Sequence, residues 1–115
     1  MNDDELDVLV AEKIMGWTNV HGMDGGLMIR SGTPPGEGGA KLLPGYSLHI
    51  GDAWLVVEEM GRRGYRVEMA DRGHGLWLVG FGRISESGFP GHQSKPAARA
   101  LCLAALRALG VEVPE

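Results

Sequence analysis

The sequence of 115 residues contains little cysteine and few aromatic residues. Its single cysteine, Cys102, excludes a disulfide within the chain and a zinc site built from several cysteines. Cys102 stands in the apolar stretch ALCLAAL, where a cysteine usually acts as a small core residue. The seven aromatic residues are three tryptophans, two tyrosines and two phenylalanines, so each is a notable candidate for core or ligand contact.

Long hydrophobic runs and basic patches are also missing. No apolar run approaches the roughly 20 residues of a membrane span. The formal net charge is −4, and Arg62 and Arg63 are the only adjacent basic pair, so there is no footprint for nucleic acid. The acidic N-terminal stretch is unlike a secretory signal. We therefore expect a cytoplasmic protein that binds neither membrane nor nucleic acid.

Helical spacing marks the first element. Asp3 or Asp4 can cap a helix, and its apolar stripe comprises Leu6, Leu9, Val10, Ile14 and Trp17. We predict a helix over residues 4–15. Glycine and proline then crowd residues 21–46, which we predict to be irregular apart from a short strand at 27–30. Within this segment GEGGAKL lacks the serine or threonine of a phosphate-binding P-loop.

A second helix is predicted within residues 46–64, with Ser47 or Asp52 as its cap and Gly64 at its end. Its predicted buried face comprises Ala53, Val56, Val57 and Met60, with Trp54 also placed in the core. Residues 65–73 alternate between apolar and polar, which is typical of a strand with one buried face. A turn is predicted at 72–75, and a second strand at 76–84 would run back beside the first. Together they predict an antiparallel hairpin.

The final segment predicts a third helix, with Ser94 as cap, Pro96 in the first turn and Gly110 at the end. Its many alanines predict close packing against a second copy of the chain, and hence a homo-oligomer. Residues 1–115 are thus expected to form a single domain of the α+β class. We predict an alpha-beta-alpha layered sandwich with about three helices and an antiparallel, hairpin-based sheet.

Four stretches, LDVLVAEKIMGW, PGYSLHIGDAWLVVEEM, LWLVGFG and AARALCLAALRALG, together resemble the phage ABA-sandwich family, small α/β proteins of phages and prophages. The resemblance covers most of the chain outside the segment rich in glycine and proline. It implies the layered fold and a viral accessory role, but brings no catalytic motif.

The start of the third helix is one half of a candidate site. His92, Ser94, Lys95 and Arg99 gather where free backbone N–H groups and the helix dipole attract anions. The other half is the stretch before the second helix, where Tyr46 can stack on a ring and Ser47 and His49 can form hydrogen bonds. Trp17 is a further stacking candidate. Ordinary helix capping and core packing explain the same residues, and both interpretations remain open.

The leading hypothesis is a non-catalytic sponge that sequesters a nucleotide-derived immune signal of the host, such as a cyclic nucleotide or a cyclic ADP-ribose derivative. We expect no catalytic residues, no cofactor and no metal site, since the four histidines show no HExxH or HxH spacing. One alternative is a protein-interaction module that inhibits or redirects a host protein through an exposed apolar patch. Another is a small nucleotide hydrolase with His74 or His92 as its base.

Overall fold

The computed structural model describes residues 2–21, 31–83 and 91–113. The first half of the chain forms one helix and three short strands, α1 (Asp3–Lys13), β1 (Thr18–His21), β2 (Ser31–Thr33) and β3 (Lys41–Leu42). The second half forms α2 (Ile50–Arg62), β4 (Tyr65–Asp71), β5 (Trp77–Arg83), β6 (His92–Ser94) and α3 (Ala97–Ala108). The predicted α+β class, three helices and antiparallel hairpin are confirmed. Among the described residues, none of the helices is long and apolar enough to cross a membrane.

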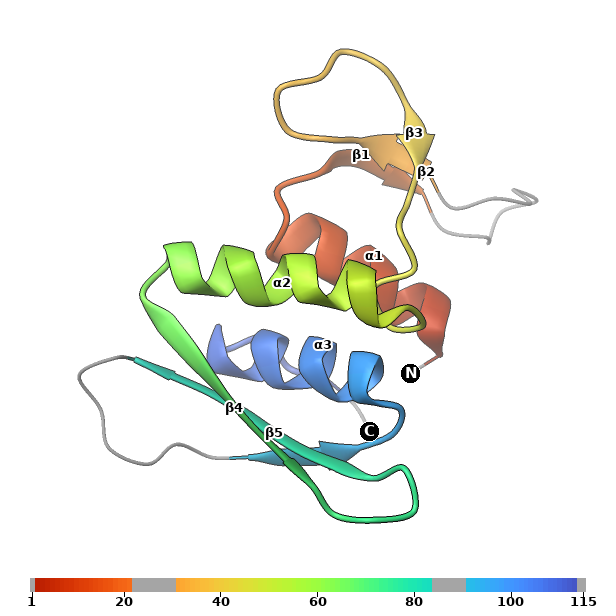
Figure 1. The fold of residues 1–115 in the computed structure, drawn as a ribbon. Helices are drawn as coiled ribbons and strands as arrows, with labels where there is room; N and C mark the ends of the chain where they lie inside the picture. Colours follow the sequence, from red (N-terminus) through yellow and green to blue (C-terminus); the bar gives the residue numbers. More distant parts are fainter. Residues whose placement is uncertain (1, 22–30, 84–90, 114–115) are drawn as a thin grey trace.

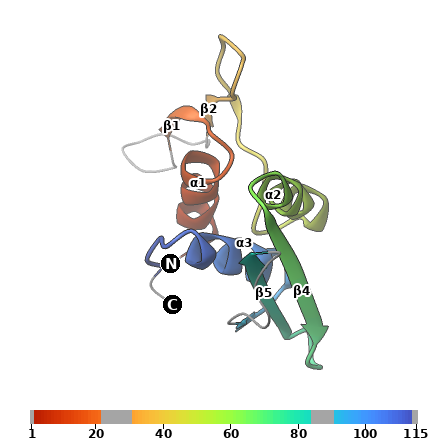
Figure 2. The ribbon, with the colours of Figure 1, turned by 90° about the vertical axis from the view of Figure 1, so that its left-hand side faces the viewer.

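Helix α3 lies at the centre of the molecule, between the sheet of β4, β5 and β6 and the other two helices (Figures 1 and 2). One side of α3 packs on β5 and β6, and its other sides contact α1 and α2. The small sheet of β1, β2 and β3 lies beyond α1 (Figure 1). Helices α1 and α2 and the sheet of β4, β5 and β6 therefore all meet at α3, whereas the small sheet packs on α1.

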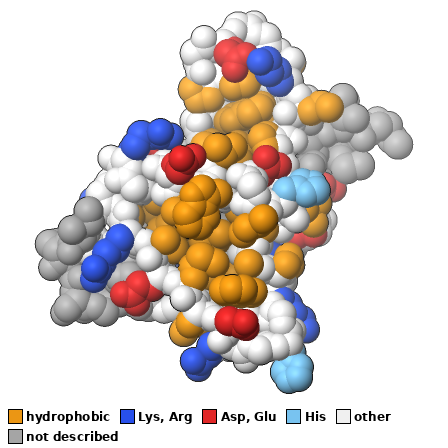
Figure 3. All heavy atoms as spheres, viewed as in Figure 1, with side chains coloured by type: hydrophobic (Ala, Val, Ile, Leu, Met, Phe, Trp, Pro, Cys, Tyr) orange, Lys and Arg blue, Asp and Glu red, His pale blue; other side chains and the backbone are white. Residues whose placement is uncertain are grey.

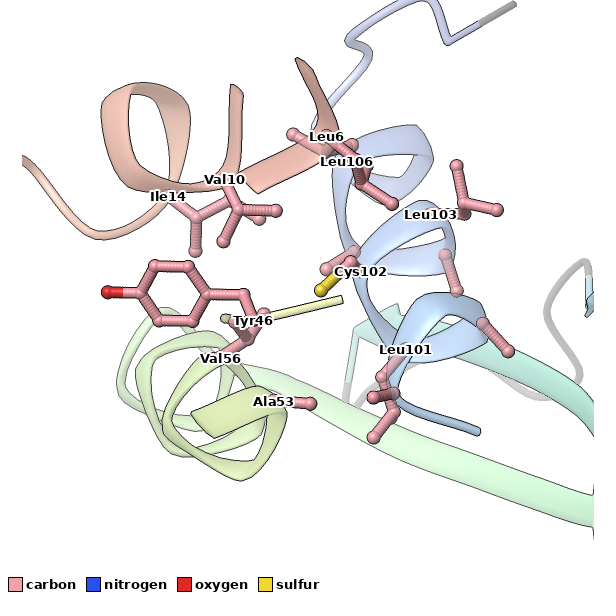
Figure 4. Close-up of a cluster of buried hydrophobic side chains, with 14 of the residues drawn as sticks. Leu6, Val10, Ile14, Tyr46, Ala53, Val56, Leu101, Cys102, Leu103 and Leu106 are labelled. Carbon is pink, nitrogen blue, oxygen red and sulfur yellow. The ribbon is translucent and has the colours of Figure 1, made fainter. Parts of the chain in front are cut away.

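The core is built from the helical stripes that face α3. Eight of the twelve α3 residues are buried, and Leu101, Cys102, Leu103 and Leu106 are fully enclosed. In Figure 4, Leu106 lies next to Leu6 of α1 and Cys102 faces Tyr46 and Val56, whereas Leu103 points to the opposite side of α3. The alanines of α3 allow this close approach within a single chain. Ala98, Ala100, Ala104 and Ala105 are buried within one chain, so they do not offer the predicted surface to a second copy. The homo-oligomer itself stays a prediction.

Strands β4 and β5 form the predicted hairpin, in register from Tyr65 opposite Arg83 to Asp71 opposite Trp77. The turn between them uses positive φ at Gly73, His74 and Gly75, as glycine-rich turns do. A third strand, β6, pairs with the start of β5, with Trp77 opposite Ser94. Ser94 is therefore a strand residue and not the predicted cap of α3, because its backbone pairs with Trp77 of β5. Pro96 occupies the cap position of α3 instead.

The segment predicted to be irregular over 21–46 holds two short strands in its described part. β2 pairs with both β1 and β3 in antiparallel fashion. Glycine at position 32 allows β2 to pack closely against Trp17 and Val20, which follow α1. A Cβ at this position would lie 3.1 Å from the Trp17 ring and 3.2 Å from a Val20 methyl. The strand predicted at 27–30 falls outside the described residues.

Two details of α2 differ from the prediction. The helix begins after His49, so neither Ser47 nor Asp52 is its cap. Asp52 instead accepts a hydrogen bond from the Gly45 N–H at 3.1 Å, closing the turn that leads into the helix. Trp54, predicted to be in the core, is 48% exposed. The buried face of α2 is Ala53, Val56 and Met60, and Trp54 lies about 100° around the helix from Ala53.

We predict that Leu101→Ala lowers the free energy of unfolding by about 2–5 kcal/mol, because the side chain is fully enclosed and its loss leaves a cavity. The matched control is Arg107→Ala, an exposed position on the same helix, which should change stability by less than about 1 kcal/mol. Urea denaturation measures both. A loss below about 1 kcal/mol for Leu101→Ala would show that α3 is not the central element.

Candidate functional site

The beginnings of the three helices meet at one corner of the molecule. Asp7, one turn into α1, is fully buried and accepts a hydrogen bond from the Ser47 N–H at 2.8 Å. Ser47 stands just before α2 and is itself fully buried. A carboxylate that is removed from water needs such partners, because an unpaired buried charge is strongly unfavourable. The pair therefore ties the turn before α2 to α1.

The first turn of α3 joins the same corner. Arg99 Nη1 donates to a carboxylate oxygen of Asp3 at 2.7 Å, linking the first turns of α3 and α1. The Ser47 hydroxyl donates to the backbone carbonyl of Asp3 at 3.4 Å. Two of the predicted site residues, Ser47 and Arg99, are thus brought together through Asp3, although they are far apart in sequence. We refer to Asp3, Asp7, Ser47 and Arg99 as the helix-start corner.

Tyr46 points away from this corner and into the core. Its side chain is 1% exposed and lies among Ile14, Val10 and Val56 (Figure 4). Burial raises the pKa of Tyr46 to about 12, although a hydrogen bond with Trp17 acts in the opposite direction. The structure thus pairs two predicted stacking residues with each other. Neither ring of this pair forms an open platform, because Tyr46 is enclosed and Trp17 is half-buried against it.

The other predicted site residues lie around the corner or apart from it. Lys95 is exposed and Ser94 is half-buried, both just before α3. His49 is exposed at the start of α2. His92 begins β6, and its side chain lies outside the described part of the structure. His74 is exposed at the hairpin turn, where the neighbouring Asp71 carboxylate accepts the Gly73 N–H at 2.8 Å. Turn geometry accounts for this pair.

A separate shallow depression of about 130 Å³ lies on the sheet face opposite α3. Leu78 and Gly80 line it from β5, alternating with Val79, which is buried toward α3. Glu68 and Gly91 also border it. Its lining includes a carboxylate and no cationic side chain, so it does not suit an anionic ligand. None of the predicted site residues lines it.

The sequence analysis did not identify Asp3 and Asp7 as site residues. Asp7 interrupts the apolar stretch LDVLV, and its side chain lies close enough to Cys102 to act on the thiol. Burial is the largest cause that raises the pKa of Cys102, and the negative charge of Asp7 raises it further. This thiol is enclosed and protonated, which agrees with its predicted core role. The sequence signal that could have pointed to this corner is Asp7, a charged residue within an apolar helical stripe.

Within the described residues, no group of three or more His, Cys, Asp or Glu side chains could hold a metal ion.

The proteins that this chain resembles share the fold described above. The model of the phage ABA sandwich domain matches residues 8–106. The chain belongs to the phage ABA sandwich family. A crystal structure of a phage protein from Bacillus cereus ATCC 14579 has the same fold, with a TM-score of 0.71 and 22% sequence identity over 99% of this chain and 93% of that one. A search of curated proteins gives no match. The family and the fold are therefore shown, and the family match begins just after Asp7.

We predict that Asp7→Ala lowers the free energy of unfolding by about 2–4 kcal/mol, since it leaves the buried Ser47 N–H without its acceptor. Asp7→Asn keeps an acceptor oxygen in place and should recover part of that loss. Glu12→Ala, an exposed position on the same helix, is the control for loss of an acidic side chain. Equal effects of the Asp7→Ala and Glu12→Ala changes on urea denaturation would contradict this role.

The enclosed Tyr46 predicts a loss of stability at alkaline pH. Its pKa is raised from 10.0 to about 12, so the folded state favours the protonated phenol. That contribution is complete below pH 10 and is lost as the pH rises from about 10 to about 12. A pKa shift of two units corresponds to about 2–3 kcal/mol in the free energy of unfolding. In Tyr46→Phe the stability should fall less steeply over this range, as measured by denaturation at fixed pH. If the stability of Tyr46→Phe falls with pH as steeply as that of the parent protein, Tyr46 is excluded as the source of the alkaline loss.

Proposed function

We propose that this member of the phage ABA sandwich family is a non-catalytic accessory protein that binds and holds a small nucleotide-derived anion. A phage could use such a sponge to remove an immune signal of its host. The observation that carries this proposal is the helix-start corner, where Ser47 and Arg99 both bind Asp3 and the exposed Lys95 stands just before α3 in the chain. N-terminal N–H groups and helix dipoles attract anions at such ends.

Asp3 is the residue on which ligand binding at this corner depends. Its carboxylate already engages Arg99 at 2.7 Å. An incoming phosphate would compete with that carboxylate for the guanidinium, because both are anions that bind arginine in the same way. Binding therefore requires Arg99 to exchange Asp3 for the ligand. The exposed ammonium of Lys95 is a second cation near the start of α3.

The experiment is native and then denaturing mass spectrometry of the purified protein, followed by calorimetry with cyclic nucleotides and cyclic ADP-ribose-like molecules. A sponge carries or binds an anion and releases it chemically unchanged on denaturation. A hydrolase, whose base would be His74 or His92, releases products instead. A flat titration with the folded protein across the whole panel would remove the sponge proposal.

Variants of the corner test the site itself. Asp3→Asn removes the competing charge and should strengthen binding of a nucleotide anion by about tenfold, a change of about 1.4 kcal/mol. Lys95→Ala should weaken it several-fold, because it removes an exposed cation with little structural role. Lys13→Ala, at the opposite end of α1, is the control and should leave affinity unchanged. Weaker binding in Asp3→Asn would contradict the exchange of partners at Arg99.

A second candidate function is a protein-interaction module that inhibits or redirects a host protein. The specific observation in its favour is a group of exposed large hydrophobic side chains on and before α2. Mass spectrometry distinguishes the two functions, because a protein binder releases no small molecule. The same surface also has features that favour a second copy of this chain.

A further inference from the structure

The exposed hydrophobic side chains of the described residues gather in one stretch of the chain. Five large ones are 41–65% exposed, and all of them lie between residues 42 and 55: Leu42, Leu48, Ile50, Trp54 and Leu55. We call these five the apolar surface. Figure 3 shows hydrophobic side chains collected over α2, with charged side chains at the margins. This surface is separate from the buried face of α2, which packs inward through Ala53, Val56 and Met60.

From this surface we infer that two copies of the chain associate through α2, with the helices antiparallel about a two-fold axis near Trp54. The inference is independent of the ligand proposed above. Closed two-fold dimers are the commonest soluble oligomers, and their interface must be complementary to itself.

The size of the apolar surface suits such a dimer. A large side chain has on the order of 200 Å² of surface, so about half of five side chains amounts to on the order of 500 Å². A standard interface buries about 800 Å² on each partner. In homodimers about 65% of that area is apolar, which again is on the order of 500 Å². The apolar surface therefore provides the hydrophobic part of a standard interface without further residues.

The glycines of α2 allow the helices to approach closely. Gly51 and Gly61 lie inside the helix, and a Cβ built at either one comes within 4 Å of no described atom beyond the adjacent residues and the helix's own backbone. Packing within the chain therefore does not require glycine at these positions, although glycine weakens a helix relative to alanine. Gly51 is one turn before Leu55 on the exposed side. A neighbouring backbone can approach the helix there.

The charges on α2 make the surface complementary to itself. Ile50, Trp54 and Glu58 are spaced four residues apart and so form one stripe. Glu58 is exposed, whereas the neighbouring Glu59 is held by Arg62 and Arg63. His49, at the cap position of α2, makes no side-chain hydrogen bond to the helix start. If the helices cross antiparallel near Trp54, Glu58 of each copy lies beside the positively polarised start of the partner's helix.

This arrangement distinguishes a second copy from another kind of partner. An apolar surface alone suits any hydrophobic partner. Glu58 and the start of α2 lie on opposite sides of Trp54, and His49 makes no capping side-chain hydrogen bond there. In a two-fold dimer the contact between Glu58 and the partner's helix start forms twice. A two-fold axis thus satisfies both helix starts with the residues already present.

Sedimentation velocity of the full chain from about 1 to 200 µM tests the dimer. We expect the mass of two copies at the upper concentrations. Trp54→Glu places a charge at the centre of the interface and should raise the dimer dissociation constant by at least about 30-fold. Glu58→Lys should also raise it, because a cation then faces the partner's helix start. Glu12→Lys, an exposed position on α1, is the charge-matched control and should leave it unchanged.

Circular dichroism and a thermal melt establish that each variant is folded. If Trp54→Glu fails to fold, Leu48→Lys replaces it, since Leu48 lies before α2 and is 51% exposed. A protein that stays monomeric at every concentration overturns the inference and leaves the apolar surface to another partner. A dimer that is insensitive to both Trp54→Glu and Glu58→Lys also overturns it, because association then uses a different face.

Discussion

The hydrogen bond from the Ser47 N–H to the buried carboxylate of Asp7 is the interaction on which the arrangement of the helices depends. Both residues are fully enclosed, and they join segments that lie 40 positions apart in the chain. An enclosed carboxylate requires donors, so the turn before α2 must return to α1 if the fold is to form. Cys102 of α3 lies within electrostatic reach of the same carboxylate, which brings the central helix to this junction.

Two features of the surface follow from this junction. With Ser47 fixed against Asp7, the preceding Tyr46 is directed into the core, and the following Leu48 and Ile50 are left exposed. The same turn brings the Ser47 hydroxyl to Asp3, where Arg99 also binds. One buried hydrogen bond thus positions both the corner proposed for anion binding and the apolar surface proposed for self-association. The hydrogen bond between Asp7 and Ser47 therefore serves the fold and also places the surfaces on which the two proposals rest.

The parts of the fold that could be predicted from sequence are those with strong local periodicity. The apolar stripe of α1, the alternation of β4 and the alanine and leucine composition of α3 each specify an element within a few residues. The short strands β1, β2, β3 and β6 have two to four residues each, too few for a period to emerge, and they form through pairing with distant segments. For the candidate site, sequence reasoning found Ser47 and Arg99 and the general position of the corner. It missed Asp3 and Asp7, because their partners come from other elements. It misplaced Trp54, because one residue along a helix turns a side chain by about 100°, which here moves it from the buried face to the exposed one.

The most direct test of this account is hydrogen exchange at the Ser47 amide, followed by NMR. Because that N–H is buried and donates to Asp7, its exchange should require global unfolding, as for the amides of α3 around Leu101. The account predicts opening free energies for Ser47 and Leu101 that agree within about 1 kcal/mol. Exchange of the Ser47 amide at the rate of an exposed loop amide, such as that of Gly38, would contradict it.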